Sequence, residues 1–162
     1  MIELTRNRGY AIIGLQNPSK IVNIGHALRA AGAMNGKMVA VAKASFKDTV
    51  TDTAKAYRHV PLVMVEELKE VIPYDCTPVA VELLKDAKPL HEYHHPERAF
   101  YIFGPEEGVI DDYVLDYCKE RVYIPSNYSL NMGVTVNIIL YDRLAKQLID
   151  QKVKKNRSEI FR

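Results

Sequence analysis

The chain has 162 residues, of which 48% are hydrophobic and 26% charged, with a formal net charge of +2 at pH 7. These values are ordinary for globular proteins and exclude a disordered or fibrous chain, and the length suits one domain over residues 1–162. No apolar run approaches the length that crosses a bilayer, and the N-terminus lacks a hydrophobic signal region. We therefore expect a soluble, cytoplasmic protein with no membrane partner.

Short apolar segments alternate with helical patterns along the chain. In order, they predict a strand over residues 10–15, a helix over 22–34, a strand over 37–42, a helical turn over 51–57, a strand over 61–65, a helix over 65–72, strands over 78–83 and 99–103, a helix over 110–118, a strand over 121–124 and a helix over 130–151. A polar connection over residues 89–96 precedes the strand over 99–103. This alternation is typical of an α/β fold with a mostly parallel sheet flanked by helices.

Two of the predicted helices have apolar residues at helical spacing. In the first, Ile24 and Leu28 lie one turn apart, which predicts a buried face. In the last, Val134, Ile138 and Tyr141 alternate with polar side chains, and a stripe facing the core is the ordinary interpretation.

The cysteines and histidines do not suggest a metal site. Cys76 and Cys118 are isolated, so we expect two reduced, partly buried thiols. His91, His94 and His95 form a small cluster, but no other ligand stands at a spacing that would close a zinc site. We expect this cluster to lie in a solvated loop.

The last part of the chain is basic. From Arg143 to the C-terminus there are seven basic residues and two acidic ones. Such a run is usually a solvated helix face. A basic C-terminal tail over residues 152–162 that contacts RNA is the other interpretation.

Three polar segments carry the candidate chemistry. The segment NIGHALR opens the first predicted helix at residues 23–29, FGPEEG follows a strand at residues 103–108, and IPSNYSLN leads into the last helix at residues 124–131. On their own, Ser129 and Asn131 are typical of a helix N-cap. No glycine-rich GxGxxG follows the first strand, which argues against Rossmann-like methyltransferases and dinucleotide enzymes.

Together and in this order, the three segments resemble the motifs of the SpoU branch of the SPOUT methyltransferases, trefoil-knotted enzymes that methylate RNA. The resemblance runs from about residue 10 to residue 148. It implies S-adenosyl-L-methionine (AdoMet) as the cofactor, with no metal, and transfer of a methyl group to a ribose 2′-hydroxyl of tRNA or rRNA. It also implies an α/β-knot fold with a C-terminal deep trefoil knot, and a homodimer that pairs through the last helix and shares its active site between subunits.

The resemblance assigns catalytic roles residue by residue. Arg29 is implied as the catalytic arginine, and Asn23 as a residue that holds this arginine or the substrate. Glu106 is implied to position the substrate or to order its loop. Ser129 and Asn131 are implied at the reaction centre, although helix capping is an equally ordinary role for Asn23 and Asn131.

The cofactor contacts follow in the same way. Gly104 is implied to line the AdoMet pocket, since glycine permits close approach of the backbone. Ile124, Ser129 and Leu130 are implied to hold the cofactor through backbone or apolar contacts.

The position of Arg29 and the high pKa of an arginine side chain both bear on the chemical role of this residue. It follows Gly25 by one turn, and the missing side chain at Gly25 leaves room beside the guanidinium. Arginine is often proposed as the general base, but its pKa lies above about 12. Stabilising a developing alkoxide while gripping a phosphate is easier to defend.

Two other functions compete with this interpretation. One is a knotted RNA-binding protein that has lost catalysis, against which the joint presence of Arg29, Glu106, Ser129 and Asn131 speaks. The other is methylation of a base nitrogen, as in other SPOUT branches.

Overall fold

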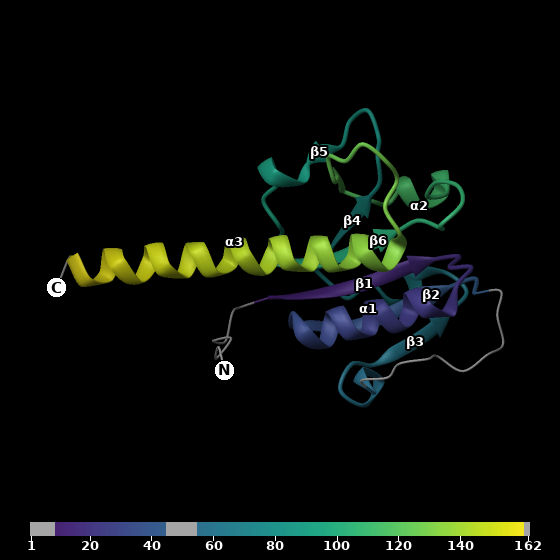
Figure 1. Ribbon diagram of the computed structural model, residues 1–162, viewed down its shortest axis with the longest axis horizontal. Helices are drawn as coiled ribbons and strands as arrows, with labels where there is room; N and C mark the ends of the chain where they lie inside the picture. The colour runs from purple at the N-terminus through teal and green to yellow at the C-terminus, as the bar shows by residue number, and fades with distance from the viewer. Residues whose placement is uncertain (1–8, 45–54, 161–162) are drawn as a thin grey trace.

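The structure is a computed structural model that describes residues 9–44 and 55–160, with side chains to residue 154. In chain order its elements are β1 (Tyr10–Gln16), α1 (Ile21–Ala33), β2 (Gly36–Ala42), η1 (Ala56–Arg58), β3 (Leu62–Val65), η2 (Leu68–Val71), β4 (Thr77–Val81), β5 (Lys88–Pro89), η3 (Leu90–Glu92), β6 (Arg98–Phe103), α2 (Asp112–Leu115), β7 (Glu120–Tyr123) and α3 (Met132–Ile160). The seven described strands form one sheet in the order β3-β2-β1-β6-β4-β7-β5, and every neighbouring pair is parallel (Figure 1). The predicted parallel α/β architecture is confirmed.

The predicted strands are confirmed to within two residues at each end. The apolar runs work as predictors because the central strands are buried on both faces, as is usual in parallel sheets. In β1 the side chains of Ile13 and Leu15 face the core beneath α1 and α3, whereas Ile12 faces the opposite core. Only β5 has no counterpart among the predictions, because its two residues are too short to carry a pattern.

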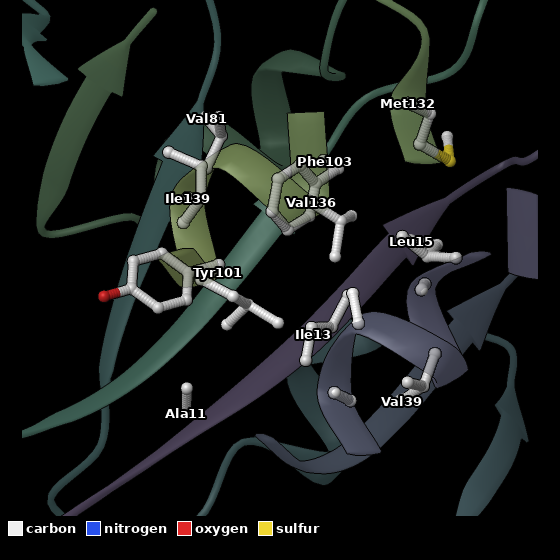
Figure 2. Close-up of a cluster of buried hydrophobic side chains, with 14 of the residues drawn as sticks. Ala11, Ile13, Leu15, Val39, Val81, Tyr101, Phe103, Met132, Val136 and Ile139 are labelled. Carbon is white, nitrogen blue, oxygen red and sulfur yellow. The ribbon is translucent and has the colours of Figure 1, made fainter. Parts of the chain in front are cut away.

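The sheet therefore has a core on each face. Helices α1 and α3 lie side by side on one face, where side chains from β1, β6 and α3 gather (Figures 1 and 2). The other face is covered by η2 and α2, through Leu68 and Val114. This three-layer arrangement leaves the carboxyl ends of the strands open at one edge of the sheet.

The helix predicted over residues 65–72 is wrong. Val65 is the last residue of β3, where it pairs with Ala42, and only the short 3-10 helix η2 follows. Ile72 is extended, with φ −74° and ψ 115°, as expected for a residue before Pro73.

Two other helical predictions differ in extent. The helix predicted over residues 110–118 is present as the single turn α2, because the backbone of Lys119 already donates to the Pro78 carbonyl at 3.0 Å and leads into β7. Of the turn predicted over residues 51–57, residues 51–54 lie outside the described residues, and η1 covers the end of that stretch.

Helix α3 is longer than predicted and turns a different face inward. Its buried side chains include Met132, Val136, Ile139 and Leu140. Val134 and Tyr141 are 45% and 65% exposed, so the predicted core stripe through these two residues is wrong. The C-terminal half of α3 projects beyond the rest of the described chain (Figure 1). No helix in the described part of the chain, α3 included, is both long and apolar enough to cross a membrane.

A buried polar clasp, made of His95, Tyr101, Asp142 and Arg143, fastens the middle of α3 to the sheet. His95 lies 2.8 Å from Asp142 through Nε2 and 2.6 Å from the Tyr101 hydroxyl through Nδ1. Arg143 donates to the Tyr101 hydroxyl at 3.2 Å and to the Pro96 carbonyl at 2.6 Å. The predicted solvated loop is wrong for His95, whose side chain is 5% exposed, and Arg143 is equally buried.

The clasp holds His95 in its neutral form. Burial lowers the pKa of His95 to about 4, and this effect outweighs the neighbouring Asp142 carboxylate, which raises it. The neutral ring can donate from Nε2 to Asp142 and accept the Tyr101 proton at Nδ1. Because Arg143 donates to the same tyrosine oxygen, the hydrogen bonds run in one direction from Arg143 to Asp142.

Lys146 has a structural role as well. Its ammonium donates to the carbonyls of Leu90 and Tyr93 at 2.6 and 2.9 Å and pairs with Asp142 at 2.7 Å. The first two members of the basic run, Arg143 and Lys146, are thus occupied within the chain. Beyond them, the side chains of Lys152 and Lys154 are exposed.

Candidate functional site

A cavity of about 670 Å³ opens at the carboxyl ends of three neighbouring strands, β6, β4 and β7. Ligands of open α/β sheets bind at this edge, because the loops that leave parallel strands converge there. Glu82 follows β4, Gly104 follows β6 and Ile124 follows β7, and all three line the cavity. Loop residues 125–130 and the first turn of α3 complete the wall.

The charge of the cavity is negative. Glu82 and Glu106 line it, and no lysine, arginine or histidine does so among the residues that the structure describes. The remaining lining is apolar or neutral, with Phe103, Leu130 and Met132 among its apolar members. Such a cavity suits a ligand that carries positive charge on an apolar body, and it disfavours polyphosphates.

Glu106 ties two of the predicted segments together. Its Oε2 accepts hydrogen bonds from the Ser19 amide at 2.9 Å and the Ser19 hydroxyl at 3.0 Å. Its Oε1 accepts a hydrogen bond from the side-chain amide of Asn23, in the first turn of α1. The loop after β6 is thus fixed to the beginning of α1. Glu107 next to it is exposed.

The same contacts keep Glu106 ionised. Burial by itself raises the pKa of this carboxyl, but the hydrogen bonds from Ser19 and Asn23 outweigh burial and hold the pKa below its ordinary value. Asn23 is fully buried, and its Oδ1 has no hydrogen-bond partner in the described part of the chain. A buried, unpaired acceptor of this kind is unusual and suits a position next to a ligand or a partner.

The third segment meets the cavity through its loop. Ile124, Ser129 and Leu130 line the cavity, whereas Asn131 does not. Asn131 is the N-cap of α3, since its Oδ1 accepts hydrogen bonds from the amides of Gly133 at 2.9 Å and Val134 at 3.3 Å. The ordinary interpretation of Asn131 is therefore correct, and it fixes the end of the loop that carries Ser129.

Arg29 stands apart from the cavity within one chain. It lies on α1 six residues beyond Asn23, which corresponds to about 9 Å along the helix axis. Its side chain is exposed, and among the described residues it makes no ion pair or hydrogen bond. Of the eight predicted site residues, five line the cavity (Glu106, Ser129, Gly104, Ile124 and Leu130), Asn23 contacts one of these, and Asn131 caps the adjoining helix.

Several lining residues were absent from the sequence-based set, among them Glu82, Tyr128 and Thr135. Glu82 directly follows a buried strand at the functional edge, so its position after β4 was a usable signal. Tyr128 and Thr135 lie on either side of the predicted Ser129–Asn131 segment, and a single sequence gives no sign that they enter the cavity. Among the described residues, no group of three histidine, cysteine or acidic side chains could hold a metal ion.

Solved structures with a similar fold include methyltransferases. The SpoU methyltransferase AviRb from Streptomyces viridochromogenes superposes with a TM-score of 0.78 at 18% identity, covering 90% of this chain and 62% of that one. A probable methylase family protein from Haemophilus influenzae has a TM-score of 0.80 at 20% identity, over 95% of this chain and 71% of that one. A structure described as giving insights into the 2-OH methylation of C/U34 on tRNA has a TM-score of 0.72 at 22% identity, over 90% and 95%.

The similarity to these solved structures establishes the fold. The chain spans less than two thirds of the length of AviRb. No curated protein matches the chain by sequence. The model of the SpoU rRNA methylase family, however, matches residues 10–141, which include all three polar segments and all seven described strands of the sheet. The chain therefore belongs to the SpoU rRNA methylase family.

Proposed function

We propose that the cavity binds AdoMet and that the protein transfers a methyl group to a ribose 2′-hydroxyl of tRNA or rRNA. The observation that carries the proposal is the joining of all three motif segments around one cavity whose only charged lining residues, in the described structure, are carboxylates. When bound, AdoMet would supply a methyl group on a cationic sulfonium. AviRb has been solved with AdoMet, and one similar structure is described in terms of 2-OH methylation on tRNA.

The cavity fits this cofactor in size, polarity and shape. Its volume of about 670 Å³ lies in the usual range for small-molecule sites. A Cβ added at Gly104 would stand 3.0 Å from the Ile110 side chain and 3.2 Å from Glu82. Glycine at this position avoids that crowding at the wall of the cavity. The two carboxylates give the cavity a negative charge, which favours a ligand with net positive charge such as AdoMet and selects against anionic nucleotides.

The residues around the cavity would have separate roles in binding the cofactor and the RNA. Ile124, Ser129, Leu130 and Gly104 would hold the cofactor through the loop and the strand ends. Asn23 and Glu106, already joined to each other, would position the RNA at the beginning of α1. Such fixed contacts align the hydroxyl with the methyl group, and alignment supplies much of the rate in a transfer of this kind.

Arg29 would act on the RNA rather than on the cofactor. Its guanidinium would grip a phosphate and stabilise the negative charge that develops on the ribose oxygen. Because Arg29 lies away from the cavity of its own chain, we propose that a second subunit brings the two together.

A homodimer through α3 is the arrangement that we propose. The outward face of this helix exposes Val134, Tyr141, Leu148, Ile149 and Val153. A row of apolar side chains on one long helix is typical of a surface that is covered in an assembly. The chain that leads into α3 is also the segment that we propose to pass through the deep trefoil knot.

A methyl-transfer assay tests the function directly. The purified protein is incubated with tritiated AdoMet and RNA from cells that lack its gene, in the presence of a chelator, and the RNA is then hydrolysed with alkali. Label that resists alkaline cleavage, as a 2′-O-methylated linkage must, supports the proposal. Label on a base would favour base-nitrogen methylation, and RNA binding without label would favour the knotted RNA-binding protein. Because such an enzyme acts where tRNA and rRNA are found, we also propose a cytoplasmic location.

A pair of variants ties the activity to the cavity. Glu106→Gln removes the charge that accepts hydrogen bonds from Ser19 and Asn23, and it should reduce methyl transfer strongly. Glu107→Gln changes the same charge on an exposed neighbour that does not line the cavity, and it should behave like wild type. Equal activity of the two variants would contradict the placement of the site.

A further inference from the structure

The two carboxylates of the cavity are not equivalent. Both oxygens of Glu106 are occupied by hydrogen bonds from Ser19 and Asn23. Glu82 uses Oε1 to accept a hydrogen bond from the Leu83 amide at 3.0 Å, and its Oε2 has no hydrogen-bond partner among the described residues. The cavity therefore contains one anionic acceptor that is still available to a ligand.

The position of Glu82 is rigid. Its amide donates to the Val122 carbonyl of β7 at 3.0 Å, and its own carbonyl accepts from the Leu84 amide at 3.0 Å. The bond to the Leu83 amide then fixes the carboxylate itself. An acceptor held on a strand end in this way is oriented before the ligand arrives, which is what a precise contact requires.

Glu82 also follows the middle one of the three strands that border the cavity. Strand β4 stands between β6 and β7 in the sheet, and Glu82 Oε2 would be 3.2 Å from a Cβ built at Gly104. On the β7 side are Ile124 and Leu130, whose apolar side chains suit the adenine ring of the cofactor, and on the β6 side is Glu106, next to the proposed RNA contact. The part of AdoMet that joins the adenine to the sulfonium is the ribose, so the ribose of a cofactor bound in this orientation would lie at the Glu82 carboxylate.

We propose that Glu82 is a specificity-determining residue that accepts hydrogen bonds from the 2′,3′-diol of the cofactor ribose. The inference rests on the proposed function and adds to it a ligand requirement: an adenosyl group with an intact ribose diol. A carboxylate is suited to a diol, because it has two oxygens and acts only as an acceptor when ionised. The same pairing of an acidic residue with ribose hydroxyls recurs in dinucleotide-binding folds of different topology.

The test is a set of calorimetric titrations with wild type, Glu82→Ala and Glu82→Gln. The ligands are AdoMet, S-adenosylhomocysteine and the 2′-deoxy and 3′-deoxy forms of S-adenosylhomocysteine. For wild type, removal of a hydroxyl should weaken binding about 10-fold to 100-fold, as expected for a hydrogen bond to a charged group. Glu82→Ala should bind S-adenosylhomocysteine more weakly by a similar factor and should no longer distinguish it from its deoxy forms.

Matched controls separate the possible failures. Glu107→Gln makes the same charge change outside the cavity and should keep the wild-type preference for the diol. If wild type binds neither AdoMet nor S-adenosylhomocysteine, the proposed function itself is refuted, and this inference falls with it. If wild type binds both but Glu82→Ala retains the full preference for the diol, only the role of Glu82 is refuted.

A third result would also overturn the inference. If the Glu82 variants lost affinity for AdoMet but not for S-adenosylhomocysteine, which lacks the sulfonium charge, the carboxylate would face the sulfonium instead of the ribose. Glu82→Gln keeps an oxygen for the Leu83 amide and should therefore fold even where Glu82→Ala does not. The deoxy ligands test the diol requirement on the wild-type protein in any case.

Discussion

Acid should destabilise this protein through His95. The pKa of this ring is about 4 in the folded chain, against an ordinary value of 6.5. Between these values the unfolded chain binds a proton that the folded chain does not, so the free energy of unfolding falls as the pH drops from 6.5 towards 4. At about 1.4 kcal/mol per pKa unit, the loss from this one group is about 2.5 kcal/mol by pH 4.5.

Burial gives the effect its sign, because it disfavours the charged form of the ring, and the hydrogen bond from the Tyr101 hydroxyl acts in the same direction. A protonated ring would have to donate at both nitrogens, but Nδ1 receives the Tyr101 proton, and Arg143 already donates to that tyrosine oxygen. Protonation therefore breaks a buried hydrogen bond, and the Asp142 carboxylate compensates only in part.

Urea denaturation at pH 7.5 and pH 4.5 measures the effect. His95→Gln should be less stable than wild type at pH 7.5, because the clasp is damaged, but should lose about 2.5 kcal/mol less on acidification. His91→Gln is the control, since His91 is exposed and pairs only with Glu92 in the described structure, and it should follow wild type. If wild type and His95→Gln lost the same free energy between the two pH values, the neutral buried histidine would be refuted.

Three further outcomes are expected. Arg29→Ala should lower methyl transfer by roughly 100-fold to 1000-fold, with AdoMet binding nearly unchanged. Arg29→Lys should restore the activity only slightly, because lysine lacks the planar, two-pronged guanidinium. Near wild-type incorporation of tritiated methyl by Arg29→Ala would refute the catalytic role of Arg29. Tyr141→Lys should shift light scattering from dimer to the 18.4 kDa monomer, whereas Asp150→Lys, an exposed position on the same helix, should not; a wild type that is already monomeric at micromolar concentration would contradict the dimer. Deletion of residues 152–162 should weaken RNA binding and flatten its salt dependence without altering AdoMet affinity; an unchanged salt slope would mean that the tail is only solvated.

The strands and the motif segments could be predicted from sequence because their signals are local. Each central strand is an apolar run, and each motif lies where a strand or loop meets a helix. Two of these segments follow strands of the parallel sheet and therefore lie at the carboxyl edge of the sheet. Glu106 and Ser129 are at this edge, as the motif positions indicate.

The polar clasp could not be predicted, because its bonds join residues that lie far apart in sequence. His95 and Asp142 are separated by 47 positions, and a histidine among polar residues looks solvated until α3 covers it. The prediction of which face of α3 points inward was wrong for a related reason. Both sides of this helix carry apolar residues, so spacing alone cannot decide between Val136 and Val134.

The bond between Glu106 and Asn23 has a consequence for how this protein can evolve. Neither residue can change alone at low cost, since a fully buried Asn23 that lost the carboxylate would keep an unpaired amide, at about 1–3 kcal/mol. A lineage that abandoned catalysis would therefore be under structural pressure to retain the pair, or to lose both residues together. Among relatives of this chain, position 23 and position 106 should change in step, and an intact pair by itself would not certify an active enzyme.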